Sequence, residues 1–244
     1  MTQQRQRTSP GARIAGVVGE LLITAGIIVL LFFGWQLWIG DRIIGAQKTA
    51  DAEAVSQAWQ DEWIAEGSHG IDTSTDEVPV PSPVAEGETV GVMHVPRFGS
   101  EWQFEIAEGI SKAGILDDGR IGHYPDTALP GDIGNTAYAA HRWTSGAPFD
   151  PIDTLVVGDP IVIETTDGWY TYRFRTLEYV QASQVDVLAP VPQQAGVEPQ
   201  QRLLTLTSCA PKLNMLERII AYAVFDEFTP RGDGPPSSLT EAAS

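Results

Sequence analysis

Cys209 is the residue of this sequence best suited to covalent chemistry. It is the single cysteine of the chain, it ends the apolar run LLTLTS, and Ala210 and Pro211 follow it. Because proline cannot continue strand pairing, the thiol is expected at a strand terminus. A lone cysteine is commonly a small buried hydrophobe. A nucleophilic one needs a base or a cation beside it, since an unperturbed thiol has a pKa of about 8.5.

His141 and Arg218 are the candidate partners of this thiol. His141 closes the predicted strand NTAYAAH, and Arg218 begins the strand after the Cys209 loop, so a hairpin would return it beside Cys209. A guanidinium there can hold an oxyanion with two donors, which is the electrostatic help that acyl transfer requires. Spacing alone also allows a structural histidine and an arginine paired with Glu217 or another acid.

Short β-rich runs separated by Gly, Pro or Asp would position these side chains, within a domain predicted at residues 87–230. An Asp-Gly step at residues 167–168 is typical of a hairpin turn. Runs of strands without long helical patterns predict an all-β barrel or sandwich. The predicted strands are Thr89–Val95, Trp102–Ala107, Asn135–His141, Pro160–Thr166, Trp169–Val180, Arg202–Cys209 and Arg218–Phe225.

An apolar run at residues 14–39 predicts a transmembrane helix, because a hydrocarbon core needs about 20 apolar residues. More arginines precede the run than follow it closely, which predicts a cytoplasmic N-terminus at residues 1–13 and an extracytoplasmic domain in a single-pass protein of the cell membrane. A cleavable signal peptide is the competing interpretation, but the run exceeds the usual apolar length of about 7–15 residues.

Two further segments flank the predicted domain. Residues 40–86 are predicted to hold an amphipathic stalk helix, marked by Val55, Trp59 and Trp63 at four-residue steps, and an acidic, Pro-rich linker. The helix is expected to fold onto its own domain or onto the membrane surface. Residues 231–244 contain few large apolar side chains, which predicts a disordered tail, and their RGD triplet is not interpreted as an adhesion motif.

The charge of the chain excludes some functions. The 244 residues include 32 acidic and 15 basic side chains, for a formal net charge of −17. Such a surface repels nucleic acid. With one cysteine the chain cannot form an internal disulfide, and no CxxC or Cys/His cluster could hold a structural zinc ion.

Three motifs in one order resemble the sortases, whose signature is TLxTC with a distant His and a downstream Arg. They are TLTSC ending in Cys209, NTAYAAHR containing His141, and ERIIAYA containing Arg218, within a resemblance that spans about Val90 to Glu227. The segment GHYPDTALPGDIGN is similar to the class E, actinobacterial housekeeping-type branch. This chain departs from the family pattern at Ser208, where Thr is usual, and at Ala140, where Gly is common.

The resemblance implies a closed eight-stranded β-barrel with short helices and a transpeptidation. Cys209 would attack the Thr–Gly carbonyl of a C-terminal LAxTG- or LPxTG-like sorting signal on a surface protein, His141 would protonate the leaving amine, and Arg218 would steady the substrate or the oxyanion. A peptidoglycan-precursor amine of the lipid II type would resolve the thioacyl intermediate. Tyr124 of GHYP matches a position linked to the LAxTG preference, although it can also be a loop aromatic covering the barrel. No metal or organic cofactor is implied.

Other functions stay open from the sequence. An L,D-transpeptidase is disfavoured, because the SCAPKLN segment lacks the expected CxN arrangement. A non-catalytic, sortase-like binding module tethered to the membrane and a pilin-polymerising sortase are not excluded.

Overall fold

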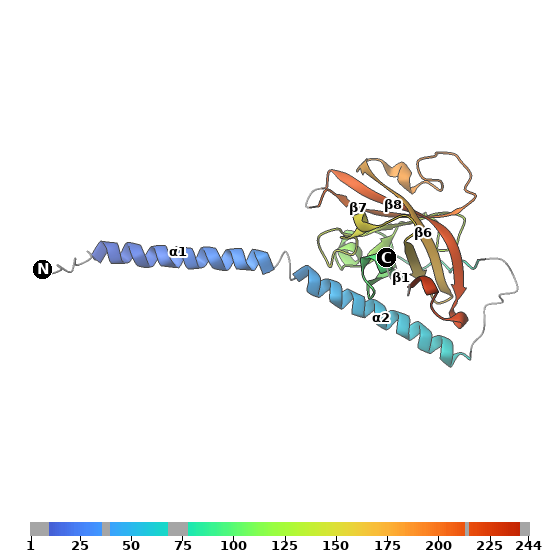
Figure 1. Cartoon of the computed structure of the whole chain (residues 1–244), viewed down its shortest axis with the longest axis horizontal. Coiled ribbons are helices and arrows are strands. Elements are labelled where there is room, and N and C mark those ends of the chain that lie inside the picture. The colour runs from blue at the N-terminus through green and yellow to red at the C-terminus, as the bar shows by residue number, and fades with distance from the viewer. Residues whose placement is uncertain (1–9, 36–39, 68–77, 213–214, 240–244) are drawn as a thin grey trace. The chain divides into compact units, whose positions relative to one another are not determined.

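The chain divides into two compact units, Met1–Arg42 and Ile43–Ser244. A computed structural model describes residues 10–35, 40–67, 78–212 and 215–239 (Figure 1). The first unit contains helix α1 (Pro10–Trp35). Its residues Arg13–Trp35 have a mean hydropathy of 2.4 and are long and apolar enough to cross a membrane. Residues 36–39 of the predicted span, like residues 1–9, lie outside the described residues.

The second unit is a closed barrel of eight strands in the order β1-β2-β3-β4-β7-β8-β6-β5. The predicted all-β fold and its closure are therefore confirmed. Strand pairs β2/β3 and β4/β7 are parallel, and the other pairs are antiparallel. The bounds are β1 Thr89–His94, β2 Gln103–Glu108, β3 Ile121–His123, β4 Gly134–Ala139, β5 Pro160–Glu164, β6 Gly168–Gln181, β7 Arg202–Ala210 and β8 Glu217–Pro230.

Strand β3 was not among the predicted strands, and His123, expected in a loop, is its last residue. Three residues are too few to show the alternation by which a strand is identified in a sequence. His123 is buried, and its Nδ1 lies 2.7 Å from Glu108 Oε2. The ring is thus held inside the fold by an acid on the neighbouring strand β2.

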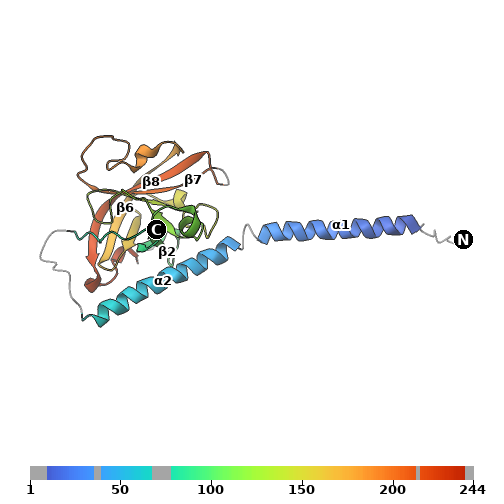
Figure 2. The same cartoon turned by 180° about the vertical axis from the view of Figure 1, so that it is seen from behind.

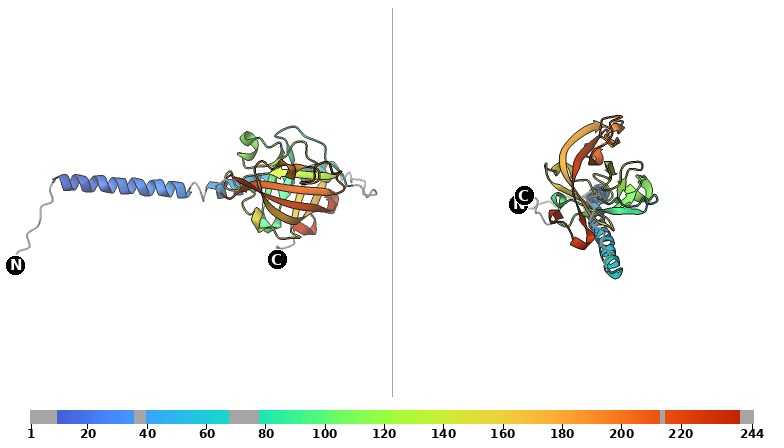
Figure 3. Two further views of the ribbon diagram at one scale, coloured as in Figure 1. Left: turned by 90° about the horizontal axis from the view of Figure 1, so that it is seen from above. Right: turned by 90° about the vertical axis from the view of Figure 1, so that its right-hand side faces the viewer.

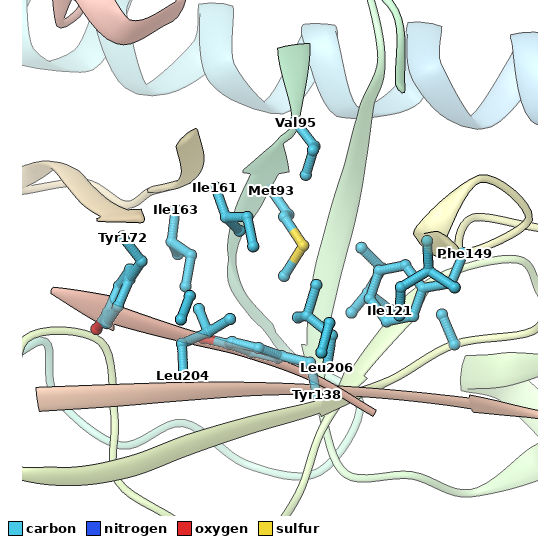
Figure 4. Close-up of a cluster of buried hydrophobic side chains, with 14 of the residues drawn as sticks. Met93, Val95, Ile121, Tyr138, Phe149, Ile161, Ile163, Tyr172, Leu204 and Leu206 are labelled. Carbon is cyan, nitrogen blue, oxygen red and sulfur yellow. The ribbon is translucent and has the colours of Figure 1, made fainter. Parts of the chain in front are cut away.

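The barrel interior is filled by side chains that alternate inward along the strands, as Figure 4 shows for Met93, Ile161, Ile163 and Leu204. Large aromatic rings complete the packing, and Tyr138 and Tyr172 are fully buried. Each fully buried aliphatic side chain of this core contributes about 1.5–3 kcal/mol to the free energy of unfolding. The barrel is therefore a filled core, and the strand ends are where side chains can reach substrate.

The predicted hairpin at residues 167–168 joins β5 to β6. Thr165 N–H donates to Gly168 C=O at 2.8 Å. Gly168 has a φ of 151°, and a Cβ there would lie 2.2 Å from the Thr229 carbonyl oxygen. Only glycine fits this turn, because the neighbouring strand β8 passes against it.

Helix α2 (Asp41–Ala65) packs against the barrel, as Figures 1 and 3 show from two directions. Its Ala52 is fully buried, and the predicted stripe of Val55, Trp59 and Trp63 is half-buried. The Trp59 ring lies 6.0 Å from the Arg231 guanidinium. Of the two expected positions for this helix, the structure shows the one on its own domain.

The prediction of a disordered tail is wrong for residues 231–239, which form the short helices η6 (Arg231–Asp233) and η7 (Ser237–Leu239). Polar contacts order them: Arg231 is buried, stacks 4.8 Å from the Trp169 ring and donates to the carbonyls of Thr165 and Thr166. A count of large apolar side chains misses such contacts. Residues 240–244 lie outside the described residues.

A buried carboxylate, Glu164, joins the helix, the barrel and the tail. It accepts hydrogen bonds from Ser56 Oγ at 2.8 Å and from Arg231 Nη2 at 3.0 Å, and His94 Nε2 lies 2.9 Å away. Burial alone would raise the pKa of Glu164, but these hydrogen bonds outweigh burial and hold the pKa below its ordinary value. Glu164 is therefore ionised in the folded protein and fixes α2 to the barrel.

Replacing Glu164 by glutamine should cost about 3 kcal/mol of unfolding free energy, because the buried Arg231 guanidinium loses its carboxylate partner. A pKa that folding lowers contributes stability above the ordinary glutamate pKa of about 4.3, and this stability is lost as pH falls through the lower folded value. Below about pH 4.3 the wild-type protein should therefore lose stability more steeply than Glu164→Gln. Thermal unfolding followed by tryptophan fluorescence measures both slopes, and parallel slopes would contradict the assignment.

Candidate active site

Cys209 lies on β7 at the position paired with Arg218 of β8. The antiparallel hairpin therefore brings the two residues together as the sequence predicts. Cys209 is half-exposed, so its thiol is accessible from the surface of the barrel. Arg218 Nη1 donates to the Met215 carbonyl at 3.1 Å and to the Glu217 carbonyl at 3.0 Å. Within the described part of the chain its hydrogen-bond partners are main-chain carbonyls, so the expected alternative of a pair with the Glu217 carboxylate is not seen.

His141 is brought toward Cys209 by the parallel pairing of β4 with β7. Ala139 is the partner of Thr207 in this pair, an offset of 68 residues. The Ala140 N–H continues the ladder by donating to the Thr207 carbonyl at 3.3 Å. The same offset extended two residues beyond the strand would set His141 opposite Cys209, and both residues line one cleft. Strand β4 itself ends at Ala139, so His141 lies just beyond the strand that was predicted to include it.

Ser208 and Ala140, the two departures from the family pattern, contact each other. Ser208 Oγ donates a hydrogen bond of 2.7 Å to the Ala140 carbonyl, and both side chains are buried. This bond ties the residue before Cys209 to the residue before His141. Ser208 has the same hydroxyl as the threonine of the family pattern, so the hydrogen bond is kept. It lacks the methyl group of threonine.

Asp117 is a site residue that the sequence did not indicate. Its Oδ1 lies 2.8 Å from His141 Nε2, and it follows the short helix η3 (Lys112–Leu116) between β2 and β3. The His141 side chain is 19% exposed and that of Asp117 is 54% exposed. An acid at this place orients the imidazole ring through this contact. The Asp-Asp-Gly segment signals only a turn in the sequence.

Tyr124 directly follows β3, and its hydroxyl lies 3.0 Å from Thr207 Oγ1. Thr207 precedes Cys209 by two residues on β7, so the two side chains share a face of the strand. The backbone of Tyr124 is held by Ala137 and Thr127. The predicted substrate-binding residue therefore lies on the same face of β7 as the thiol.

A cleft of about 810 Å³ contains all four predicted site residues. Exposed apolar side chains at its rim, Ile110, Met215 and Leu216, could not be singled out from the sequence, because they lie in loops without periodicity. The lining residues are Ile110, Lys112, Leu116, Asp117, Tyr124, Ala139, Ala140, His141, Trp143, Thr144, Thr207, Ser208, Cys209, Met215, Leu216 and Arg218.

The arrangement places a nucleophile, an acid–base group and a fixed positive charge at one cleft. A thiol can act as a nucleophile when a histidine at the same site takes up its proton. The guanidinium can stabilise negative charge on a carbonyl oxygen under attack. Acyl transfer through a thioester is the chemistry that these groups support together.

Removing the Ser208 hydroxyl should disturb both stability and the thiol. Ser208→Ala leaves the buried Ala140 carbonyl without its donor, which should cost about 1–2 kcal/mol of unfolding free energy. Movement of His141 should also slow alkylation of Cys209 by iodoacetamide several-fold. Ser208→Thr, the matched control, keeps the hydroxyl and should stay near wild type in both measurements. Wild-type stability and alkylation rate in Ser208→Ala would show that this bond positions nothing.

A model of the sortase domain matches residues 93–226. Sortase SrtE1 of Streptomyces coelicolor is 35% identical over 245 residues, which cover 97% of this chain and 65% of that protein. Sortase SrtE2 of the same organism is 34% identical over 252 residues, which cover 98% of this chain and 94% of that protein. The chain thus spans about two thirds of SrtE1 and nearly all of SrtE2.

Solved structures of sortases also resemble this chain. The SrtA sortase from Actinomyces oris matches with a TM-score of 0.63 and 37% identity, covering 67% of this chain and 94% of that one. Sortase E1 from S. coelicolor, with a tripeptide in its active site, matches with a TM-score of 0.59 and 39% identity, covering 63% of this chain and 97% of that one. The chain therefore belongs to the sortase family of cysteine transpeptidases, beside members of class E.

Proposed function

We propose that this chain is a membrane-anchored transpeptidase that joins secreted surface proteins to the cell wall. It would cleave a C-terminal LAxTG- or LPxTG-like sorting signal between Thr and Gly and transfer the protein to a peptidoglycan-precursor amine. The observation that carries the proposal is the position of Cys209, His141 and Arg218 at neighbouring strand ends of one cleft.

In the first step the Cys209 sulfur attacks the threonine carbonyl carbon. A C–S bond forms, the C–N bond to glycine breaks, and His141 gives its proton to the leaving amine. Arg218, at the position opposite Cys209, holds the negative charge that develops on the carbonyl oxygen. The products of this step are a thioacyl enzyme and the released C-terminal peptide.

In the second step an amine of the wall precursor attacks the thioacyl carbon. A new C–N bond forms, the C–S bond breaks, and the amine proton passes to His141, which restores the starting pair. Water would compete for the same carbon. The apolar rim of Ile110, Met215 and Leu216 restricts water beside the thioester once a sorting signal covers it.

The cleft also supports a role for Tyr124 in substrate choice. Its ring lines the cleft, and its hydroxyl is held by Thr207, two residues from the nucleophile. A substrate strand that presents its Thr–Gly bond to Cys209 passes this hydroxyl. The Tyr124 hydroxyl would therefore contact the residue after the leucine of the signal, where alanine and proline differ in bulk and in their N–H group.

Membrane attachment is supported by α1, which meets the length and hydropathy of a spanning helix. Sorting signals and lipid-linked wall precursors are both held at a membrane, so an anchor raises the local concentration of enzyme and substrates. The proposed orientation keeps the N-terminus in the cytoplasm, because arginines precede the apolar segment.

The full chain in detergent micelles should cleave an LAxTG peptide and join it to a glycine or diaminopimelate-type amine. Cys209→Ala should form no product, because the thioacyl intermediate requires the Cys209 sulfur. Mass spectrometry of the quenched wild-type reaction should show the acyl fragment on Cys209. Equal product from Cys209→Ala would refute the mechanism, and peptide binding without turnover by the wild type would indicate a binding module.

Substitution of Tyr124 should change the preference between LAxTG and LPxTG peptides. Tyr124→Phe removes only the hydroxyl. It should lower the ratio of kcat/KM for the LAxTG peptide to kcat/KM for the LPxTG peptide by about tenfold, as expected for the loss of one hydrogen bond. Tyr124→Ala should lower it further by removing the ring. Competition between the two peptides in one reaction measures the ratio directly. An unchanged ratio in both variants would mean that Tyr124 does not read the signal.

A further inference from the structure

We propose that the first turns of α2 are a positioning element of the active site. They hold the turn that contains Asp117 and the loop that follows His141, and these two segments orient the His141 ring. The five residues Gly45, Lys48, Asp118, Gly119 and Gly146 are called the α2 junction below. The element acts on the transpeptidation proposed above, although one of its tests does not depend on any substrate. Figure 2 shows the N-terminal, bluer end of α2 near the green loops that contribute residues to the cleft.

The first contact of the junction joins two backbones. A Cβ placed on Gly45 would lie 3.2 Å from the Gly146 carbonyl oxygen, and one placed on Gly146 would lie 3.2 Å from Gly45 N and Cα. Gly146 has a φ of 79°, between Ser145 at 56° and Ala147 at 47°. Two facing glycines therefore let α2 touch a loop whose backbone conformation is costly to rebuild.

The second contact closes the space between the two loops. Gly119 has a φ of 82°, and a Cβ there would lie 2.6 Å from the Ser145 carbonyl oxygen and 3.3 Å from Lys48 Cγ. The turn that contains Asp117 thus lies directly against the loop that follows His141. Lys48 of α2 covers the point where they meet.

The third contact is electrostatic. Lys48 Nζ donates to Asp118 Oδ2 at 3.1 Å and also lies 3.5 Å from Asp51 of its own helix. The Lys48 side chain is 20% exposed and that of Asp118 is 53% exposed. Such a pair contributes little affinity, but it fixes the direction from which the turn meets the helix.

Both loops lead to His141 within a few residues. Asp118 follows Asp117, whose carboxylate lies 2.8 Å from the His141 ring. Gly146 lies in the loop between His141 and Phe149, where the Phe149 N–H donates to the His141 carbonyl at 3.0 Å. A shift at the junction therefore reaches the imidazole through its carboxylate and through its own backbone.

The junction differs from the part of α2 that secures the helix. Trp59, Ser56 and the buried Glu164–Arg231 pair hold the helix further along. The junction has small residues and backbone contacts, which fix position and bury little apolar area. Because catalysis loses rate steeply with sub-ångström displacement of its groups, a contact of this kind acts on turnover more than on stability.

The test uses the full chain in detergent micelles. Gly45→Leu adds a side chain where Gly146 leaves no room, while leucine favours the helix more than glycine does. Ala54→Leu, at an exposed position of the same helix, is the matched control. Gly45→Leu should lower kcat by about tenfold or more with KM within about twofold, because no junction residue lines the cleft. Its thermal midpoint should stay close to that of the control.

Removal of the ion pair gives a second test. Lys48→Met and Asp118→Asn should each lower kcat about threefold, and the double variant should lower it no further than either single variant, because both changes remove the same contact. The rate of Cys209 alkylation by iodoacetamide should fall in Gly45→Leu, since the displaced imidazole no longer assists the thiol.

The outcomes separate this inference from the proposed function. If the wild type does not turn over the peptide, the proposed function fails, and the alkylation rates alone decide on the junction. Wild-type kcat and alkylation rate in Gly45→Leu, or additive losses of kcat in the Lys48→Met, Asp118→Asn double variant, would overturn the positioning role.

Discussion

The structure depends on the parallel pairing of β4 with β7. One register offset directs His141 and Cys209 into the same cleft, and it aligns Ser208 with the Ala140 carbonyl. Thr207 of the same strand lies within hydrogen-bond distance of the Tyr124 hydroxyl. A slip by one residue would reverse the face of every side chain on the strand. The register is protected by the barrel core, because β4 points Tyr138 into it and β7 points Leu204 and Leu206 into it. Closure of the barrel also leaves neither strand a free edge.

The sequence predicted the parts of the site that belong to strands. Cys209 and His141 follow apolar runs that signal strands, and Arg218 begins another such run. The hairpin between β7 and β8 pairs Arg218 with Cys209. The meeting of His141 with Cys209 needed more than spacing. Parallel pairing between segments so distant in the sequence leaves no local signal. The prediction that these two residues act together therefore came from the resemblance to the sortases.

The parts that the sequence did not predict are held by polar contacts between distant segments. Asp117 lies in a turn whose residues indicate a turn and nothing more, and its partner follows 24 residues later. Arg231 begins a segment poor in apolar residues, yet a buried carboxylate and two aromatic rings order it. Hydrophobic periodicity cannot reveal these contacts. Each joins a charged side chain to a partner from a distant segment, and an apolar pattern indicates no such pairing.

The acidic composition of the chain explains why the environment of Arg218 matters. The chain has 32 acidic and 15 basic side chains, so a basic side chain readily pairs with a carboxylate. Arg97, Arg142 and Arg173 form such pairs. Arg218 instead donates to two carbonyls of its own loop. A carbonyl fixes the side chain without neutralising it. In the proposed mechanism this charge would be available for the oxygen that becomes negative during acyl transfer, so a cation held by carbonyls would let a strongly acidic domain stabilise an oxyanion.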